Sequence, residues 1–200
     1  MTITDYWTLQ HCGQAEFKDK GSRFLAYAYP VKHETAIKVQ IQELREQHHK
    51  ARHWCYGWRL GIDGHLFRAN DDGEPAGSAG RPILGQIDSA GLTDTLIVVV
   101  RYFGGTLLGV PGLIHAYKSA ANLVLQTTPK IQCPVYQNVQ LHCDYARLSE
   151  ALRIARQHQA EIQQQNLQLD CCLLIQVPLA QLSACLAAWQ QTRAISVKLL

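Results

Sequence analysis

The sequence of 200 residues has no long hydrophobic run and no excess of charge of one sign. Its longest apolar stretches, such as Leu96–Val100, are far shorter than the roughly 18 residues that a membrane span needs. The net charge is only +3, and the pI of about 8.5 lies below the value near 9 that is typical of nucleic-acid-binding domains. Membrane spans are therefore excluded, and charge alone does not indicate a nucleic-acid partner.

The sequence also has no recognisable targeting signal and no cysteine pattern typical of disulfide-bonded proteins. The opening residues MTITDYWTLQHCGQ contain no basic segment followed by an apolar stretch, so we expect no signal peptide. The seven cysteines are odd in number and show no regular spacing. We therefore expect reduced thiols and a cytoplasmic protein.

Glycine is absent from the last part of the chain, since all 14 glycines precede residue 113. The change in composition falls near Thr128, Pro129 and Pro134, and proline resists helix continuation. We place a boundary there, which predicts one domain over residues 1–130 and a second over residues 134–200.

The second domain shows clear periodicity. Residues 135–143 alternate between apolar and polar side chains and predict a strand, and a helical pattern follows from Leu148 to Ala155. Two extended segments (161–169 and 171–177), a helix near 179–189 and a strand at 194–200 complete the order βαββαβ. This is the ferredoxin-like pattern, which hosts many functions and indicates none.

The first domain is predicted to be α+β with a mixed sheet. Strands are expected at 7–12, 24–30, 52–60 and 96–100, helices near 37–44 and 113–124, a polar turn at 16–22 and an irregular loop at 69–82. The apolar run Leu96–Val100 predicts a strand that is covered on both faces.

The segment from Arg101 to Leu113 predicts a turn from a buried strand into a helix. It contains Gly104, Gly105 and Gly109, and glycine lets a ligand approach the backbone amides. A helix N-terminus attracts anions, so the turn is either a phosphate or carboxylate cradle or simply a tight packed turn. Arg101 has two interpretations as well: it binds an external anion, or it pairs with the carboxylates of the 69–82 loop.

That loop contains Asp71, Asp72 and Glu74 around Gly73. Such a cluster serves acid–base chemistry or binds Mg²⁺, but Asp and Gly are also turn formers, which favours an ordered structural loop. His53 and Cys55 share one face of a strand, but no further ligand completes a zinc site and no third group orients them as base and nucleophile. We expect no metal and no cofactor.

The aromatic side chains Trp54, Tyr56 and Trp58 lie on one face of a predicted strand. Such a stripe either stacks on nucleic-acid bases or packs against a helix, and packing is the more common outcome.

Three segments resemble the IMPACT/YigZ family. They are Ala51-Arg52-His53-x-Cys55, the run from Asp71 to Pro82, and the run from Val99 to Tyr117 with its Arg-Tyr-Phe-Gly-Gly core. The resemblance implies an N-terminal domain like the second domain of ribosomal protein S5 and a ferredoxin-like C-terminal domain. It also implies similarity to two consecutive domains of the ribosomal translocase elongation factor G. Eukaryotic members regulate translation by competing for an activator of a stress kinase. The two-domain chain resembles the bacterial type, so we do not carry that partner over to this protein.

Two functions remain open. The first is a non-catalytic binding protein that engages RNA, the ribosome or a translation factor and regulates translation, with no sequence-specific DNA binding and no membrane partner. The alternative is an enzyme that acts on a phosphorylated or anionic small molecule through the glycine-rich turn and the acidic loop. Candidate anion- or RNA-binding residues are Arg52, Arg81, Arg101, Gly104, Gly105, Gly109 and Lys118, and candidate functional-loop residues are His53, Asp71, Asp72, Gly73 and Glu74.

Overall fold

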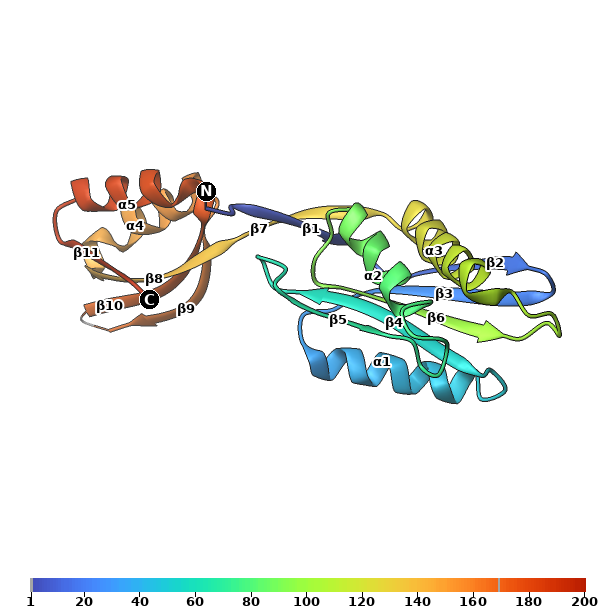
Figure 1. Ribbon diagram of the computed structural model, residues 1–200. Coiled ribbons are helices and arrows are strands. Elements are labelled where there is room, and N and C mark those ends of the chain that lie inside the picture. The colour runs from blue at the N-terminus through green and yellow to red at the C-terminus, as the bar shows by residue number, and fades with distance from the viewer. Residues whose placement is uncertain (1, 169) are drawn as a thin grey trace. The chain divides into compact units, whose positions relative to one another are not determined.

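The computed structural model describes residues 2–168 and 170–200 (Figure 1). The chain divides into two compact units, which are Tyr6–Cys133, and Pro134–Leu200 together with Met1–Asp5. Both units combine sheet and helix, so the predicted two-domain α+β class is confirmed. In the part of the chain that the structure describes, no helix is long and apolar enough to cross a membrane.

The Tyr6–Cys133 unit contains a five-stranded sheet in the order β2-β3-β6-β4-β5. Every neighbouring pair in it is antiparallel, so the prediction of a mixed sheet was wrong. The reason is that each helical crossover skips one strand, which places β6 between β3 and β4. The strands are β2 (Gly13–Asp19), β3 (Ser22–Pro30), β4 (His53–Leu60), β5 (Leu66–Asn70) and β6 (Thr95–Tyr102).

Helices cover both faces of this sheet (Figure 1). Helix α1 (Glu34–Gln47) packs on one face, and α2 (Gly80–Ser89) and α3 (Gly109–Thr127) pack on the other. Strand β6 serves both cores: Leu96, Val98 and Val100 face α1, and Ile97 and Val99 face the other helices. The predicted two-faced strand is confirmed.

Two local predictions in this unit were wrong. Residues 16–22 are not a polar turn, because β2 continues to Asp19 and only the tight hairpin turn at Lys20 and Gly21 separates it from β3. The 69–82 segment is not irregular throughout, because β5 ends at Asn70 and α2 begins at Gly80. The chain between them forms the loop 71–79. Strands β1 (Asp5–Leu9) and β7 (Lys130–Pro134) form a separate two-stranded sheet.

The Pro134–Leu200 unit follows the order βαββαβ, as predicted. Its antiparallel sheet has the order β11-β8-β10-β9, and two helices cover a core that includes Leu141, Leu173 and Trp189. The predicted strand end at Leu169 lies outside the described residues. The elements are β8 (Tyr136–Asp144), α4 (Tyr145–Gln157), β9 (Glu161–Leu167), β10 (Asp170–Pro178), the 3₁₀ turn η1 (Leu179–Gln181), α5 (Leu182–Gln191) and β11 (Ile195–Leu199).

Candidate functional site

The loop 71–79 is organised by the side chain of Asp71. Its Oδ1 accepts hydrogen bonds from the amides of Ala79 (3.0 Å) and Gly80 (2.8 Å), and its Oδ2 accepts one from Gly77 (2.9 Å). Partial burial alone would raise the pKa of Asp71, but these three amides and the nearby charge of Arg81 hold it below its ordinary value. Asp71 therefore closes the loop and caps the start of α2.

Asp72 ties the same loop to two other elements. Its Oδ1 accepts from the Arg45 guanidinium of α1 at 2.6 Å, and its Oδ2 accepts from the Trp54 amide of β4 at 2.8 Å. Asp72 and Gly73 both have positive φ angles, 43° and 87°, which turn the chain back toward the sheet. The first two carboxylates of the acidic cluster are thus held by internal bonds.

Glu74 differs because it lies in a buried polar network. Its Oε1 accepts from Arg101 Nη1 at 2.6 Å and from the Tyr117 hydroxyl at 2.8 Å. The two charged side chains are only 4% (Glu74) and 7% (Arg101) exposed. The Arg101 guanidinium also lies over the rings of Phe24 and Phe103, 5.5 and 5.6 Å from their centroids. Of the two interpretations of Arg101, the structure shows the internal pair.

His53 and Cys55 extend this network along β4. His53 Nδ1 lies 2.8 Å from the carbonyl oxygen of Asp72, which can only accept, so Nδ1 carries a proton. The other ring nitrogen, Nε2, lies 3.9 Å from Glu74 Oε1.

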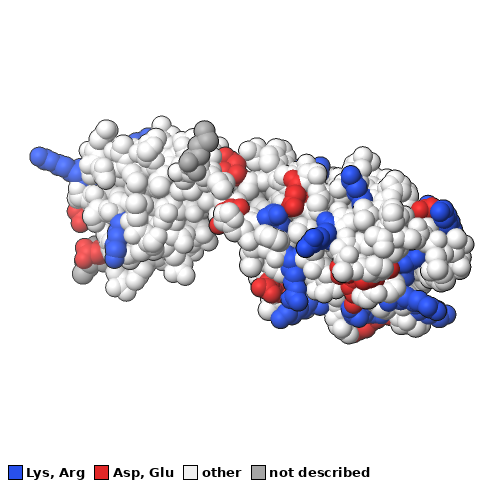
Figure 2. All heavy atoms as spheres, viewed as in Figure 1, with Lys and Arg blue, Asp and Glu red and all other residues white. Residues whose placement is uncertain are grey.

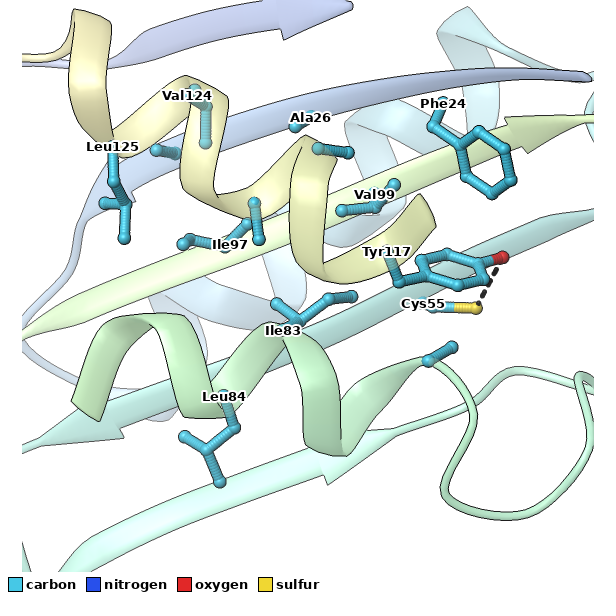
Figure 3. Close-up of a cluster of buried hydrophobic side chains, with 14 of the residues drawn as sticks. Phe24, Ala26, Cys55, Ile83, Leu84, Ile97, Val99, Tyr117, Val124 and Leu125 are labelled. Atoms are coloured by element: carbon cyan, nitrogen blue, oxygen red, sulfur yellow. Dashed lines mark hydrogen bonds between the residues drawn. The ribbon is translucent and has the colours of Figure 1, made fainter. Parts of the chain in front are cut away.

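Cys55 Sγ lies 2.9 Å from the Asp71 carbonyl oxygen and 3.3 Å from the Tyr117 hydroxyl (Figure 3). Burial raises the pKa of the Cys55 thiol well above its ordinary value, so this thiol is a poor nucleophile.

A cavity of about 450 Å³ opens beside the Glu74–Arg101 pair. Arg52, His53, Glu74 and Arg101 form its polar wall, while Phe103 and the first residues of α3 form an apolar wall. The size suits a small ligand or the end of a peptide. The full lining is Arg52, His53, Glu74, Pro75, Arg101, Phe103, Leu107, Leu108, Gly109, Val110 and Leu113.

Comparison with known proteins assigns the family. A family model described as the Impact N-terminal domain matches residues 20–125, which include the whole cavity lining. The IMPACT family member YigZ of Escherichia coli (strain K12) is 34% identical over 167 residues, which cover 82% of this chain and 81% of that protein. The chain belongs to the IMPACT family.

This IMPACT family chain is also similar to a eukaryotic protein and to a solved structure. Protein IMPACT of Bos taurus is 30% identical over 113 residues, 54% of this chain and 35% of that protein. A crystal structure described as that of a hypothetical protein is 29% identical, with a TM-score of 0.76, and covers 100% of this chain and 98% of its own. The two-domain architecture is therefore shared with a solved structure.

The three glycines of the predicted anion cradle lie in different surroundings in this IMPACT domain, and they do not line the cavity together. The Gly104 amide donates to Ser22 Oγ at 3.2 Å, and a Cβ on Gly104 would lie 1.9 Å from the Gly21 carbonyl carbon. Gly104 therefore allows the close approach of two turns. Gly105 and Gly109 have positive φ angles of 89° and 70°, and of the three only Gly109 lines the cavity.

The three remaining cations that we predicted as anion-binding residues are all exposed. Arg52 lies at the cavity wall with its guanidinium 6.0 Å from the Phe103 ring centroid. Arg81 follows the cap of α2, and Lys118 lies on α3, both outside the cavity lining. The cavity thus brings together Arg52, His53, Glu74, Arg101 and Gly109. It does not include Arg81, Lys118, Gly104, Gly105, Asp71, Asp72 or Gly73.

Sequence reasoning missed the polar role of Tyr117 and the exposed position of Phe103. Tyr117 fits the apolar stripe of α3, but a hydroxyl on such a stripe signals a buried hydrogen-bond partner. The aromatic stripe of β4 packs against α1, since Trp54, Tyr56 and Trp58 all belong to that core and Trp54 Nε1 donates to the Leu44 carbonyl oxygen. Within residues 2–168 and 170–200, no three His, Cys, Asp or Glu side chains form a group suited to a metal ion.

Proposed function

We propose that this protein is a non-catalytic binding protein of the translation apparatus, which engages RNA, the ribosome or a translation factor and regulates translation in the cytoplasm. The observation that carries the proposal is family membership, which reaches from bacterial relatives to Protein IMPACT of Bos taurus. The resemblance in the sequence implies a translational role for this family.

Exposed cations on the α2 and α3 side of the sheet support the proposal. Arg52, Arg81 and Lys118 are exposed, and within the described chain none of them forms an ion pair. Exposed cations of this kind neutralise phosphates, and among these three the charge of Arg81 also acts on the carboxylate of Asp71. Arg101 is a poor candidate for this role because Glu74 already holds its guanidinium in the buried pair.

The surface charge suggests that any phosphate contact depends on a few residues. Figure 2 shows Lys and Arg interspersed with Asp and Glu on the visible face of the Tyr6–Cys133 unit. No broad basic surface is seen on that face. We therefore expect moderate affinity with a shallow salt dependence rather than the steep dependence of a highly basic domain.

The test is binding to purified ribosomes and to ribosomal RNA over a series of salt concentrations. The triple variant Arg52→Ala/Arg81→Ala/Lys118→Ala should reduce the slope of log affinity against log salt by about 2 to 3, since each phosphate contact contributes about 0.7 to 0.9. The matched control Lys32→Ala/Lys38→Ala/Lys50→Ala removes the same charge beside α1 and should leave the slope unchanged. Absence of binding at low salt, or equal losses in both variants, would contradict the nucleic-acid form of the proposal.

The alternative function, an enzyme acting on a phosphorylated or anionic small molecule, is favoured by the cavity with Glu74 and His53 in its wall. Thermal unfolding in the presence of nucleotides, sugar phosphates and Mg²⁺ separates the two functions. A ligand at 100 times its Kd adds about 2.7 kcal/mol of stability. A flat response to all of these compounds would count against the enzyme.

A further inference from the structure

The cavity beside Arg101 has two chemically different walls. Phe103, Leu107 and Val110 are apolar, yet they are exposed, and Leu107 is 84% exposed. Large apolar side chains around a concave opening are typical of a ligand or partner site. A ligand that fills this cavity would therefore need an apolar part of its own.

The charges of the polar wall leave one positive charge uncompensated. Glu74 and Arg101 neutralise one another across 2.6 Å, whereas Arg52 has no ion-pair partner among the described residues. A ligand with a single negative charge matches this balance. A phosphate monoester carries nearly two negative charges at neutral pH, and the polar wall offers only the charge of Arg52 to balance them.

Arg101, which lines the same cavity, has one buried hydrogen-bond donor without a partner among the described residues. Its Nη1 donates to Glu74, but its buried Nε has no hydrogen-bond partner. A buried donor without a partner is uncommon and unfavourable. The Nε–H and Nη2–H groups of a guanidinium are parallel, so together they fit the two oxygens of a carboxylate.

We propose that this cavity binds a ligand in which one carboxylate is joined to an apolar body. The carboxylate interacts with Arg52 and with the part of the Arg101 guanidinium that lines the cavity, and the body packs on Phe103, Leu107 and Val110. This chemistry has two sources, a free apolar acid or the C-terminal residue of a peptide that ends in a large apolar side chain. The inference is independent of the partner in translation, because the protein alone should bind such a ligand.

Isothermal titration of the full chain tests the chemistry with matched probes. We expect binding of 4-phenylbutyrate, binding of its amide to be at least about tenfold weaker, and binding of 3-phenylpropyl phosphate to be weaker than that of the acid. The peptide Gly-Gly-Gly-Phe with a free C-terminus, compared with its amidated form, tests the second source. Tighter binding of the free peptide than of the acid assigns a chain end, and the reverse assigns a free acid.

Two variants of one helix test the location. Val110→Trp fills the cavity and should abolish binding, whereas Ile114→Trp lies one turn further along the same exposed side of α3, does not line the cavity, and should bind as the parent does. Arg52→Ala should weaken binding about tenfold, the effect of losing one hydrogen bond to a charged group. Far-ultraviolet circular dichroism shows whether each variant is folded.

Three results would overturn the proposal. The first is no binding of either free carboxylate, and the second is equal binding of acid and amide or tighter binding of the phosphate. The third is a folded Val110→Trp protein that binds as well as Ile114→Trp. Loss of ribosome binding with retained titration signals would affect only the proposed translational function.

Discussion

Arg101 and Glu74 are a buried pair whose partners depend on one another. Both side chains are almost fully removed from solvent, and Tyr117 shares the same carboxylate oxygen. Removing one partner of such a pair leaves an uncompensated charge in a poorly solvated place. Glu74 and Arg101 are 27 positions apart, so the sequence could suggest the pair but not select it from the other carboxylates of the loop.

We expect Arg101→Ala to lower the free energy of unfolding by about 3 to 5 kcal/mol, because Glu74 is left buried without its cation. The double variant Arg101→Met/Glu74→Leu removes both charges and should be much less destabilised. Urea unfolding followed by circular dichroism measures both. If Arg101→Ala is as stable as the parent, the pair does not support the fold.

Asp71 should make the loop sensitive to acid. Its pKa in the folded protein lies below the ordinary value of 3.8, so its stabilisation is present above the unfolded-state pKa and is lost as the pH falls through the folded pKa. We expect Asp71→Ala to cost about 2 kcal/mol at neutral pH, the effect of losing hydrogen bonds to a charged cap. The difference from the parent should shrink below about pH 4. A constant difference between pH 7 and pH 3 would contradict this assignment.

At the scale of elements, periodicity identified α1, α3, β6 and the whole βαββαβ unit. These elements have apolar faces whose spacing follows from the element itself. Strand β2 was missed because it is an edge strand with charged side chains on its outer face, which resembles a polar turn. Helix α2 was missed because it is short, contains Gly85 and is capped by Asp71, which lies eight or nine positions before the capped amides rather than at the N-cap. A cap in this place leaves no signal at the start of the helix.

Two glycines of α2 provide a matched test of how closely this helix packs against β5. A Cβ on Gly80 would lie 2.4 Å from the Asn70 amide nitrogen, whereas a Cβ on Gly85 would meet nothing within 4 Å. Gly80→Ala should therefore displace α2 from β5 and destabilise the protein by about 1 to 3 kcal/mol. Gly85→Ala should stabilise it by about 0.5 to 1 kcal/mol, because alanine is the better helix former. Thermal unfolding of the two variants gives the comparison, and equal shifts would contradict it.

At the scale of the whole molecule, the two compact units have separate hydrophobic cores. A unit with its own core opens as a cooperative unit in native-state hydrogen exchange. The stability of one core should thus respond little to a defect in the other.

Leu173→Ala tests this separation, since Leu173 is fully buried in the core of the Pro134–Leu200 unit. We expect a loss of about 2 to 5 kcal/mol that is confined to that unit. Amide exchange should speed up in β8 and β10 and stay unchanged in β6. Faster exchange in β6 would show that the two units unfold together.

The central position of β6 also has a consequence for folding during synthesis. Strands β3 and β4 are joined in the sheet only through β6, which lies between them and pairs with both, and β6 begins at Thr95. A nascent chain that has not yet reached this residue carries two strands without their common neighbour, and its apolar side chains have no finished core. Pairing between strands that are far apart in the sequence is slow, and it leaves apolar surface exposed to solvent during synthesis. Chaperone dependence should therefore be greatest while the first hundred or so residues emerge from the ribosome.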